Sequence, residues 1–302
     1  MTKIAILGDS VMWGQGLLDQ HKIGRLVAAA LGGSPPASAI MCAHSGGIIG
    51  ANYSGNETSK SSEVPVPAPT ILKQVDLFEN PFEIDLVLVN GGINDVDFRV
   101  ILDPFTTDDH LSSVTSDACY RDMKVLLQTV VKVFNKTSVK IIVSGYYPII
   151  SSLSHPLRDE EKELLERLLG HFALGVPLTI ERDLVVNHIV AHSLSFWHES
   201  NEALSSAVNE IGQSLNMVKR LQFVPTPFSE ENALFADDPM LFEFSDSLGT
   251  QDEVASSRAA ACDLQYPNLD QFVMRESCHY ASLGHPNVEG ASRIATAIIN
   301  AL

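Results

Sequence analysis

The 302-residue sequence has no apolar run long enough to cross a bilayer, and its amino terminus lacks the basic segment, apolar segment and small-residue cleavage site of a secretory signal. We therefore expect a soluble protein without an integral membrane segment, and the missing signal slightly favours the cytoplasm. No internal repeat and no low-complexity tract is visible. One domain over residues 1–302 is the simplest organisation, with an inserted, mainly helical and loop region at about 151–275.

Positive charge and cysteine are both scarce. The sequence has 37 acidic residues and only 20 lysines and arginines, which gives a net charge of -17. This charge disfavours nucleic acid and anionic membrane surfaces as partners. The four cysteines form no Cys-x-x-Cys pair of the kind that holds zinc. Cys262 and Cys278 are close enough in sequence to form a disulfide. A disulfide would indicate an oxidising compartment and free thiols would fit the cytoplasm, so the sequence leaves both open.

Short apolar runs rich in branched residues alternate with helical patterns along the chain. The predicted strands are residues 4–7, 39–43, 84–89, 139–144 and 221–225. Helical spacing of apolar residues is visible at 17–31, at about 116–134 and at about 288–302. This alternation predicts an α/β fold, with a parallel sheet buried between helices.

Polar and glycine residues stand directly after three of these predicted strands. The three stretches are Gly8-Asp9-Ser10, Ser45-Gly46-Gly47 and Gly92-Ile93-Asn94-Asp95, and a fourth, Gly284-His285-Pro286-Asn287, precedes the last helix. Ligands bind at the carboxyl edge of open parallel sheets, so these residues are candidates for one site. Acyl transfer by serine needs a nucleophile, a base and donors for the developing oxyanion. Ser10 is the candidate nucleophile and His285 the candidate base.

In this order, the four stretches resemble the motifs of the SGNH hydrolases, also called GDSL esterases and lipases. The resemblance implies a three-layer α/β/α sandwich with a central parallel sheet, similar to flavodoxin, carrying a helical insertion. It implies hydrolysis of a small-molecule or lipid carboxylic ester through an acyl-serine intermediate, with no metal and no organic cofactor. Ser10 would attack and His285 would act as base and then acid. The oxyanion hole would consist of the Ser10 and Gly46 backbone and the Asn94 side chain.

One position departs from the family pattern. The family usually has an aspartate three residues before the histidine, and this sequence has Ser282 there. A backbone carbonyl could orient His285 instead, which we favour, or the Ser282 hydroxyl could, or a carboxylate such as Glu276 could come from elsewhere. If none does, the protein is catalytically weak, and the alternative function is that of a binding protein with the hydrolase fold.

Residues 151–220 interrupt the alternation of strands and helices, with helical patterns at 158–172 and 183–218. This excursion fits either a lid over the site or an ordinary helical layer. The loop-rich stretch at 226–275 carries several phenylalanines, which fit a satellite core better than a lipid-binding wall. A lipid or long-chain ester is the first expectation for the substrate, and a carbohydrate acetyl ester or acyl transfer to an alcohol is the alternative.

Overall fold

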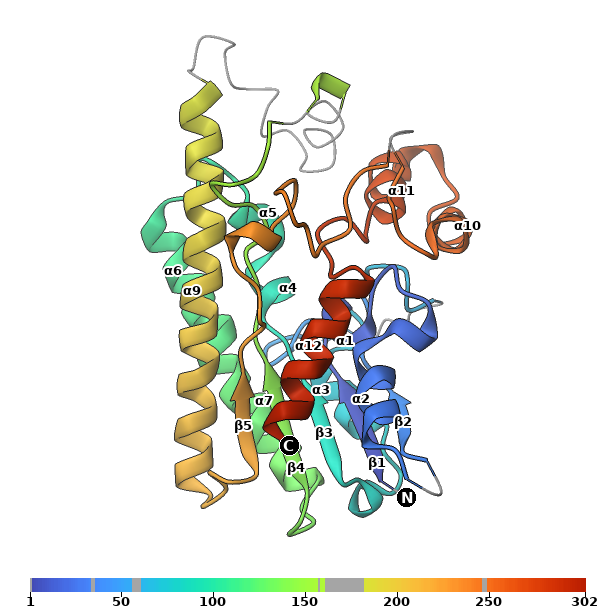
Figure 1. Ribbon diagram of the computed structural model, residues 1–302, viewed down its shortest axis with the longest axis vertical. Coiled ribbons are helices and arrows are strands. Elements are labelled where there is room, and N and C mark those ends of the chain that lie inside the picture. The colour runs from blue at the N-terminus through green and yellow to red at the C-terminus, as the bar shows by residue number, and fades with distance from the viewer. Residues whose placement is uncertain (1, 34–35, 56–60, 157, 161–181, 246–248) are drawn as a thin grey trace.

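The computed structural model describes residues 2–33, 36–55, 61–156, 158–160, 182–245 and 249–302 (Figure 1). The described chain forms a parallel sheet of β1 (Lys3–Leu7), β2 (Ser38–Met41), β3 (Leu86–Val89), β4 (Lys140–Ser144) and β5 (Leu221–Val224). The strand order is β2-β1-β3-β4-β5, the order of flavodoxin-like folds. In this register Ile6 of β1 lies beside Met41 on one side and Leu88 on the other. All five predicted strands are therefore confirmed.

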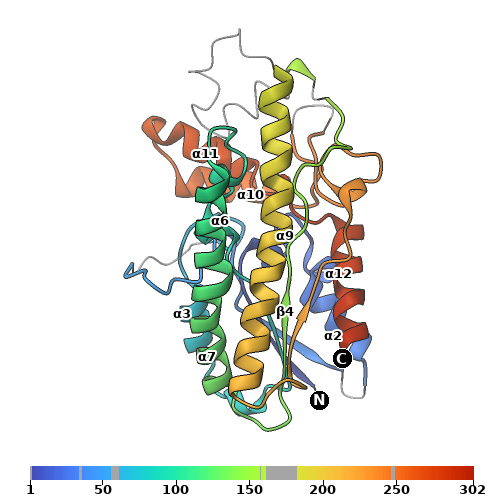
Figure 2. The same cartoon turned by 90° about the vertical axis from the view of Figure 1, so that its left-hand side faces the viewer.

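Helices cover both faces of the sheet, as Figures 1 and 2 show. On one face α2 (Ile23–Leu31) packs against α12 (Val288–Ala301), and on the other α3 (Ile71–Asp76) packs against α7 (Met123–Val133). Because both faces are covered, β3 is buried at every residue, which accounts for its uninterrupted apolar sequence. The predicted three-layer α/β/α sandwich is confirmed.

The long helix α9 (Arg182–Ser214) belongs to a helical layer. It packs against α7, α6 (Asp108–Ser116) and β5, and it runs along the β5 side of the molecule (Figures 1 and 2). The helix predicted at about 116–134 in fact begins earlier, since α6 continues through the π-helical η3 (Asp117–Asp122) into α7. Most of the helix predicted at 158–172 lies outside the described residues.

Residues 226–275 contain helices that the apolar pattern did not reveal. These are α10 (Ala255–Gln265) and the start of α11 (Phe272–His279), with the short η5 (Leu269–Gln271) between them. The buried residues of α10 are Arg258 and Cys262, so the helix has no apolar stripe to recognise. A disulfide joins Cys262 to Cys278 of α11, which settles the question that the sequence left open. Figure 1 places both helices beyond the carboxyl ends of the strands.

The phenylalanines of this stretch differ in exposure, since Phe272 is 46% exposed and three others are buried. Phe228, Phe242 and Phe244 are buried, and Phe235 stacks on Phe244. Phe228 and Phe242 thus join the main hydrophobic core, so the expected satellite core of phenylalanines is wrong, and these two rings form no lipid-facing wall.

The remaining elements are short. They are α1 (Ser10–Trp13), η1 (Asp19–His21), η2 (Pro81–Glu83), α4 (Ile93–Val96), α5 (Phe98–Ile101) and η4 (Glu230–Asn232). Among the described residues, none of the helices combines the length and the apolar character that a membrane span requires.

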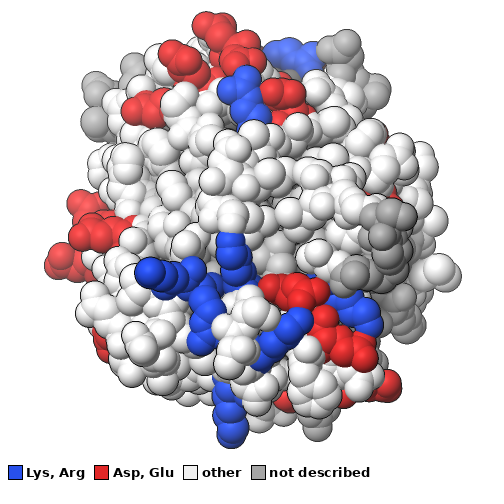
Figure 3. Space-filling model, turned by 60° about the horizontal axis from the view of Figure 1, so that its bottom comes forward, with Lys and Arg blue, Asp and Glu red and all other residues white. Residues whose placement is uncertain are grey.

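Lysine and arginine side chains gather, with acidic ones among them, at the amino-terminal ends of the strands (Figure 3). At this end Lys3 forms an ion pair with Glu83, and Lys136 forms one with Asp85. Two of these positive charges are thus paired within the chain, at the end of the sheet opposite Ser10.

Candidate active site

The turn after β1 places Ser10 at the carboxyl edge of the sheet. Gly8 has a φ of +142°, and a Cβ there would lie 2.0 Å from the Asn90 side-chain oxygen, so the turn needs glycine. Asp9 then caps α1 by accepting a hydrogen bond from the Val11 backbone N–H at 2.8 Å. Ser10 is the first residue of this helix and is buried.

Asp9 joins the Ser10 turn to two other parts of the site. Its fully buried carboxylate accepts hydrogen bonds from Asn90 Nδ2 at 2.8 Å and from the Tyr146 hydroxyl at 2.7 Å. The same hydroxyl accepts the backbone N–H of Ile93, the residue before Asn94, at 3.1 Å. Burial raises the pKa of Asp9, although its three hydrogen bonds oppose this rise. Asp9 thus braces the turns of Ser10 and Asn94 together.

His285 reaches Ser10 from the other end of the chain. Its Nε2 lies 2.7 Å from Ser10 Oγ. The turn that carries it is held by backbone bonds, since His285 N–H donates to the Ser282 carbonyl at 2.9 Å and the His285 carbonyl accepts from Phe242 at 2.7 Å. Asn287 then caps α12 by accepting from the Gly290 N–H. The structure thus brings together the two residues that the sequence proposes as base and nucleophile.

The surroundings of His285 keep its imidazole neutral. Burial lowers its pKa from 6.5 to about 4. The backbone of Ser282 and that of Leu283 raise this pKa, as carbonyl acceptors do, while Arg258 lowers it and Asp252 raises it. Nδ1 is buried, and no partner for it in the described part of the chain meets hydrogen-bond geometry. A neutral ring at pH 7 is the form that can accept a proton.

The glycine-rich turn after β2 lies against the turn that carries Asn94. Asn94 Nδ2 donates to the Gly47 carbonyl at 3.1 Å, and Asp95 accepts the Ile49 N–H with both oxygens at 3.1 and 3.0 Å. Gly46 has a φ of +71°, and a Cβ there would lie 2.6 Å from Val66 N. Within the described ranges, neither the Ser10 nor the Gly46 backbone N–H donates to a backbone carbonyl of a turn or loop.

Of the two residues considered as supports for His285, one lies beside it. Ser282 is fully buried, and its hydroxyl donates to Asp252 Oδ2 at 2.7 Å. Glu276 lies on α11 and is not among the groups that act most strongly on the His285 pKa. Asp252 was missed by sequence reasoning, because it lies in the loop-rich stretch far from the motifs and no pattern marks it.

The half-buried Glu63 contacts the segment that follows Ser10. Glu63 accepts from Trp13 Nε1 at 2.9 Å and from Gln15 Nε2 at 2.8 Å. The ammonium of Lys22 lies 4.0 Å from Glu63 and 3.1 Å from the centre of the Trp13 ring. Burial lowers the pKa of Lys22 to about 8. Across the described residues, no group of three or more His, Cys, Asp or Glu side chains is arranged to hold a metal ion.

Solved structures of hydrolases are similar to this chain, and one of them shares its fold. An extracellular lipase from Streptomyces rimosus superposes with a TM-score of 0.51 at 14% identity, over 100% of both chains. A carbohydrate esterase family 2 enzyme from Corynascus thermopiles (Myceliophthora fergusii) gives 0.48 at 15% identity, over 99% of this chain and 65% of that one. A lipase from a goat rumen metagenome gives 0.47 at 14% identity, over 100% of this chain and 97% of that one.

No protein-family model matches the sequence, and no curated protein matches it either. The likeness therefore lies in the fold. The sheet order and the superposition on the Streptomyces rimosus lipase define the class of fold, a flavodoxin-like α/β/α sandwich shared with that lipase. The fold that the resemblance to SGNH hydrolases implies is therefore confirmed.

Proposed function

We propose that the protein is a serine ester hydrolase, with Ser10 as nucleophile and His285 as general base. The observation that carries this proposal is the 2.7 Å contact between Ser10 Oγ and His285 Nε2 across 275 positions of sequence. A hydroxyl within hydrogen-bond reach of a neutral imidazole is the arrangement that activates serine for attack on a carbonyl.

In the first half-reaction, Ser10 Oγ bonds to the ester carbonyl carbon while His285 Nε2 takes the hydroxyl proton. The carbonyl oxygen becomes negative, and the Ser10 N–H, the Gly46 N–H and the Asn94 amide are proposed to bind it. When the tetrahedral intermediate collapses, the bond to the alcohol oxygen breaks and His285 returns its proton to that oxygen. The alcohol departs and the acyl group remains on Ser10.

In the second half-reaction, water attacks the acyl carbon and gives its proton to His285. The bond to Ser10 Oγ then breaks, the proton returns to Ser10 and the carboxylic acid leaves. During both steps the protonated ring needs an acceptor at Nδ1. We propose that the Ser282 backbone carbonyl serves here, because the Ser282 backbone favours the protonated ring.

The acyl chain and the alcohol remain for assay to decide. The expectation of a lipid substrate relied on the phenylalanines of residues 226–275 and on the helical excursion. Phe228, Phe242 and Phe244 are buried and form no surface for lipid, whereas Leu269, Phe272, Val273 and Met274 are exposed. The Cys262–Cys278 disulfide supports an oxidising compartment as the site of action, against the slight preference for the cytoplasm.

Hydrolysis of p-nitrophenyl esters from acetyl to palmitoyl, by the wild type and by Ser10→Ala, tests the proposal. We expect turnover by the wild type and none above background by Ser10→Ala. A fluorophosphonate should label Ser10 stoichiometrically in the wild type. A protein that is folded but neither hydrolyses any ester nor takes up the probe would support the alternative, a binding protein on the hydrolase fold.

A further inference from the structure

An arginine with no exposed surface lies behind the turn that carries His285. Arg258 of α10 is 0% exposed and binds Asp252 through two parallel bonds, from Nη1 to Oδ1 at 2.8 Å and from Nη2 to Oδ2 at 2.7 Å. Planar, two-bonded pairs of this kind fix geometry as well as charge. The side chains of both partners are fully buried.

The pair connects directly to the residue that anchors the His285 turn. Asp252 accepts the Ser282 hydroxyl at 2.7 Å, and the Ser282 carbonyl in turn accepts the His285 backbone N–H at 2.9 Å. The pair also lies against the Ser10 turn. A Cβ on Gly16 would come within 2.9 Å of the side chains of both Asp252 and Ser282. Asp252 thus fills the space between the loop of the nucleophile and the loop of the base.

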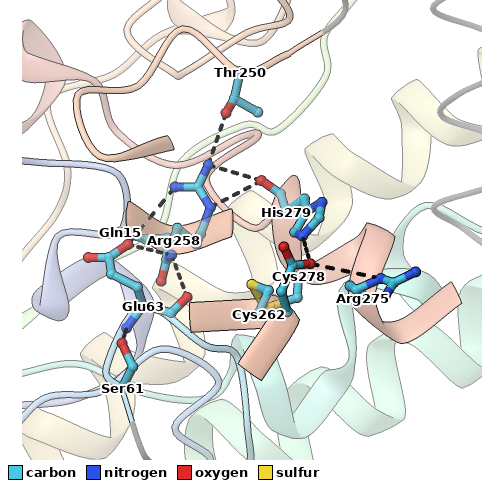
Figure 4. The surroundings of a disulfide bond; sticks show 10 residues. Gln15, Ser61, Glu63, Thr250, Arg258, Cys262, Arg275, Cys278 and His279 are labelled. Carbon is cyan, nitrogen blue, oxygen red and sulfur yellow. Dashed lines mark hydrogen bonds and ion pairs between the residues drawn. A yellow bond between two sulfur atoms is a disulfide. The ribbon is translucent and has the colours of Figure 1, made fainter. Parts of the chain in front are cut away.

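The other contacts of Arg258 hold it in one orientation. Its Nε and Nη2 donate to the His279 backbone carbonyl at 3.1 and 3.0 Å, and Nη2 also donates to Thr250. Figure 4 shows the guanidinium between His279, Thr250 and Glu63, with the disulfide beside it. Cys278 precedes His279 and Cys262 lies one turn after Arg258, so the disulfide connects the two segments that fix the guanidinium.

Stability alone is a poor explanation for this arrangement. Buried ion pairs can often be replaced by apolar side chains without loss of stability, because taking two charges out of water costs about as much as their attraction returns. Arg258 lowers the His285 pKa and Asp252 raises it, so the two charges of the pair act on the ring in opposite directions. What remains is geometric: the pair fixes where Ser282 lies.

We infer that Asp252 and Arg258 are positioning residues for His285, which hold Ser282 and through it the turn that aims the imidazole at Ser10. They take over the task of the aspartate that the family usually has at position 282. The inference rests on the proposed ester hydrolysis. Neither residue touches the reacting atoms. Arg258 fixes Asp252, and Asp252 acts on the His285 turn through the hydrogen bond that it accepts from the Ser282 hydroxyl.

Ser282→Ala is the sharpest test, because it removes this link and leaves the buried pair and the backbone carbonyl intact. Removing Asp252 would instead leave a buried guanidinium without its carboxylate partner, a change that strongly destabilises the fold and would obscure any effect on the rate. Arg258→Lys is the second variant, because lysine keeps the charge but not the two parallel bonds. The matched control is Ser151→Ala, which removes another buried serine hydroxyl, bonded to the Glu230 carbonyl at 2.8 Å.

The rate is measured as kcat per Ser10 labelled at the end point of a fluorophosphonate titration, with KM determined separately. We expect Ser282→Ala and Arg258→Lys to lose about 10–100-fold in kcat with KM within about twofold, as a misplaced base would cause. Ser151→Ala should keep the wild-type kcat per labelled site. If Ser282→Ala, Arg258→Lys and Ser151→Ala all lower the fraction of protein that the probe labels but leave kcat per labelled site unchanged, the pair is merely structural and the inference is wrong. If the wild type itself neither reacts nor labels, it is the proposed function that fails.

Discussion

The buried carboxylate of Asp9 offers a direct test of how the turns of the site are held together. It accepts hydrogen bonds from Val11, Asn90 and Tyr146, all in the interior. In Asp9→Asn, one acceptor oxygen is replaced by an amide that donates, and it faces groups that themselves donate. A hydrogen bond to a charged group contributes about 1.5–3 kcal/mol, and a buried donor left without a partner costs about 1–3 kcal/mol. We therefore expect a loss of about 2–4 kcal/mol in the free energy of unfolding.

Urea unfolding of the wild type, Asp9→Asn, Tyr146→Phe and the double variant measures this and separates the contribution of the Tyr146 contact. Because that hydroxyl bonds both Asp9 and the Ile93 N–H, the two single changes should not add. We expect a coupling energy of about 1–2 kcal/mol, in the range for residues that share one hydrogen-bond network.

Asp237→Asn is the matched control, since it makes the same chemical change at a side chain that is 93% exposed and should move stability by less than about 0.5 kcal/mol. Additive effects of Asp9→Asn and Tyr146→Phe within about 0.5 kcal/mol would refute the idea that Asp9 and Tyr146 form one brace.

Three further predictions concern ionisation and the disulfide. Since the His285 pKa is about 4, ester hydrolysis should lose its base only as pH falls through about 4, and a kcat/KM profile with an acid limb near the ordinary 6.5 would contradict this. Burial raises the Asp95 pKa to about 7, above its unfolded 3.8, so its contribution to stability is present below about pH 4 and is lost as pH rises through 7. Asp95→Asn should therefore gain in Tm over the wild type from pH 5 to 9, and a constant difference would count against this. Replacing Cys262 and Cys278 together by serine should cost about 3 kcal/mol in urea unfolding, as expected for a separation of 16 residues, whereas Cys42→Ser, at a free cysteine, should cost far less.

The sheet and its order of helices could be predicted because their signals are local. Each strand is a short apolar run that ends at glycine or a polar residue, and Ile84–Val89 shows this most clearly. The turns at Ser10 and Asn94 follow such strands directly, so topology alone brings them to one edge. His285 could be placed with them only through the resemblance to the family, since its contact with Ser10 spans nearly the whole chain.

The support behind His285 could not be predicted, because its signals are neither local nor apolar. Helix α10 buries an arginine and a cysteine, so its sequence looks like an exposed loop. Asp252 and Ser282 are 30 positions apart, and nothing in either neighbourhood indicates that the two side chains meet. A buried polar residue can be recognised only when its partner is known, and here the partner lies in another segment.

The low pKa of His285 has two opposite consequences for catalysis. A shift from 6.5 to about 4 means that the protonated ring is about 3 kcal/mol less stable than a free imidazolium, which weakens His285 as a base. The same shift keeps the ring neutral, and therefore able to accept the Ser10 proton, in mild acid. In the tetrahedral intermediate the oxyanion stands near the new imidazolium, and their attraction in a buried site offsets part of this cost. The proposed site therefore depends more on the orientation of the His285 imidazole toward Ser10 than on a carboxylate charge at its Nδ1. In the proposed mechanism, that dependence gives a role to the fully buried Asp252–Arg258 pair, which is bonded to Ser282 at the position where SGNH hydrolases usually have an aspartate.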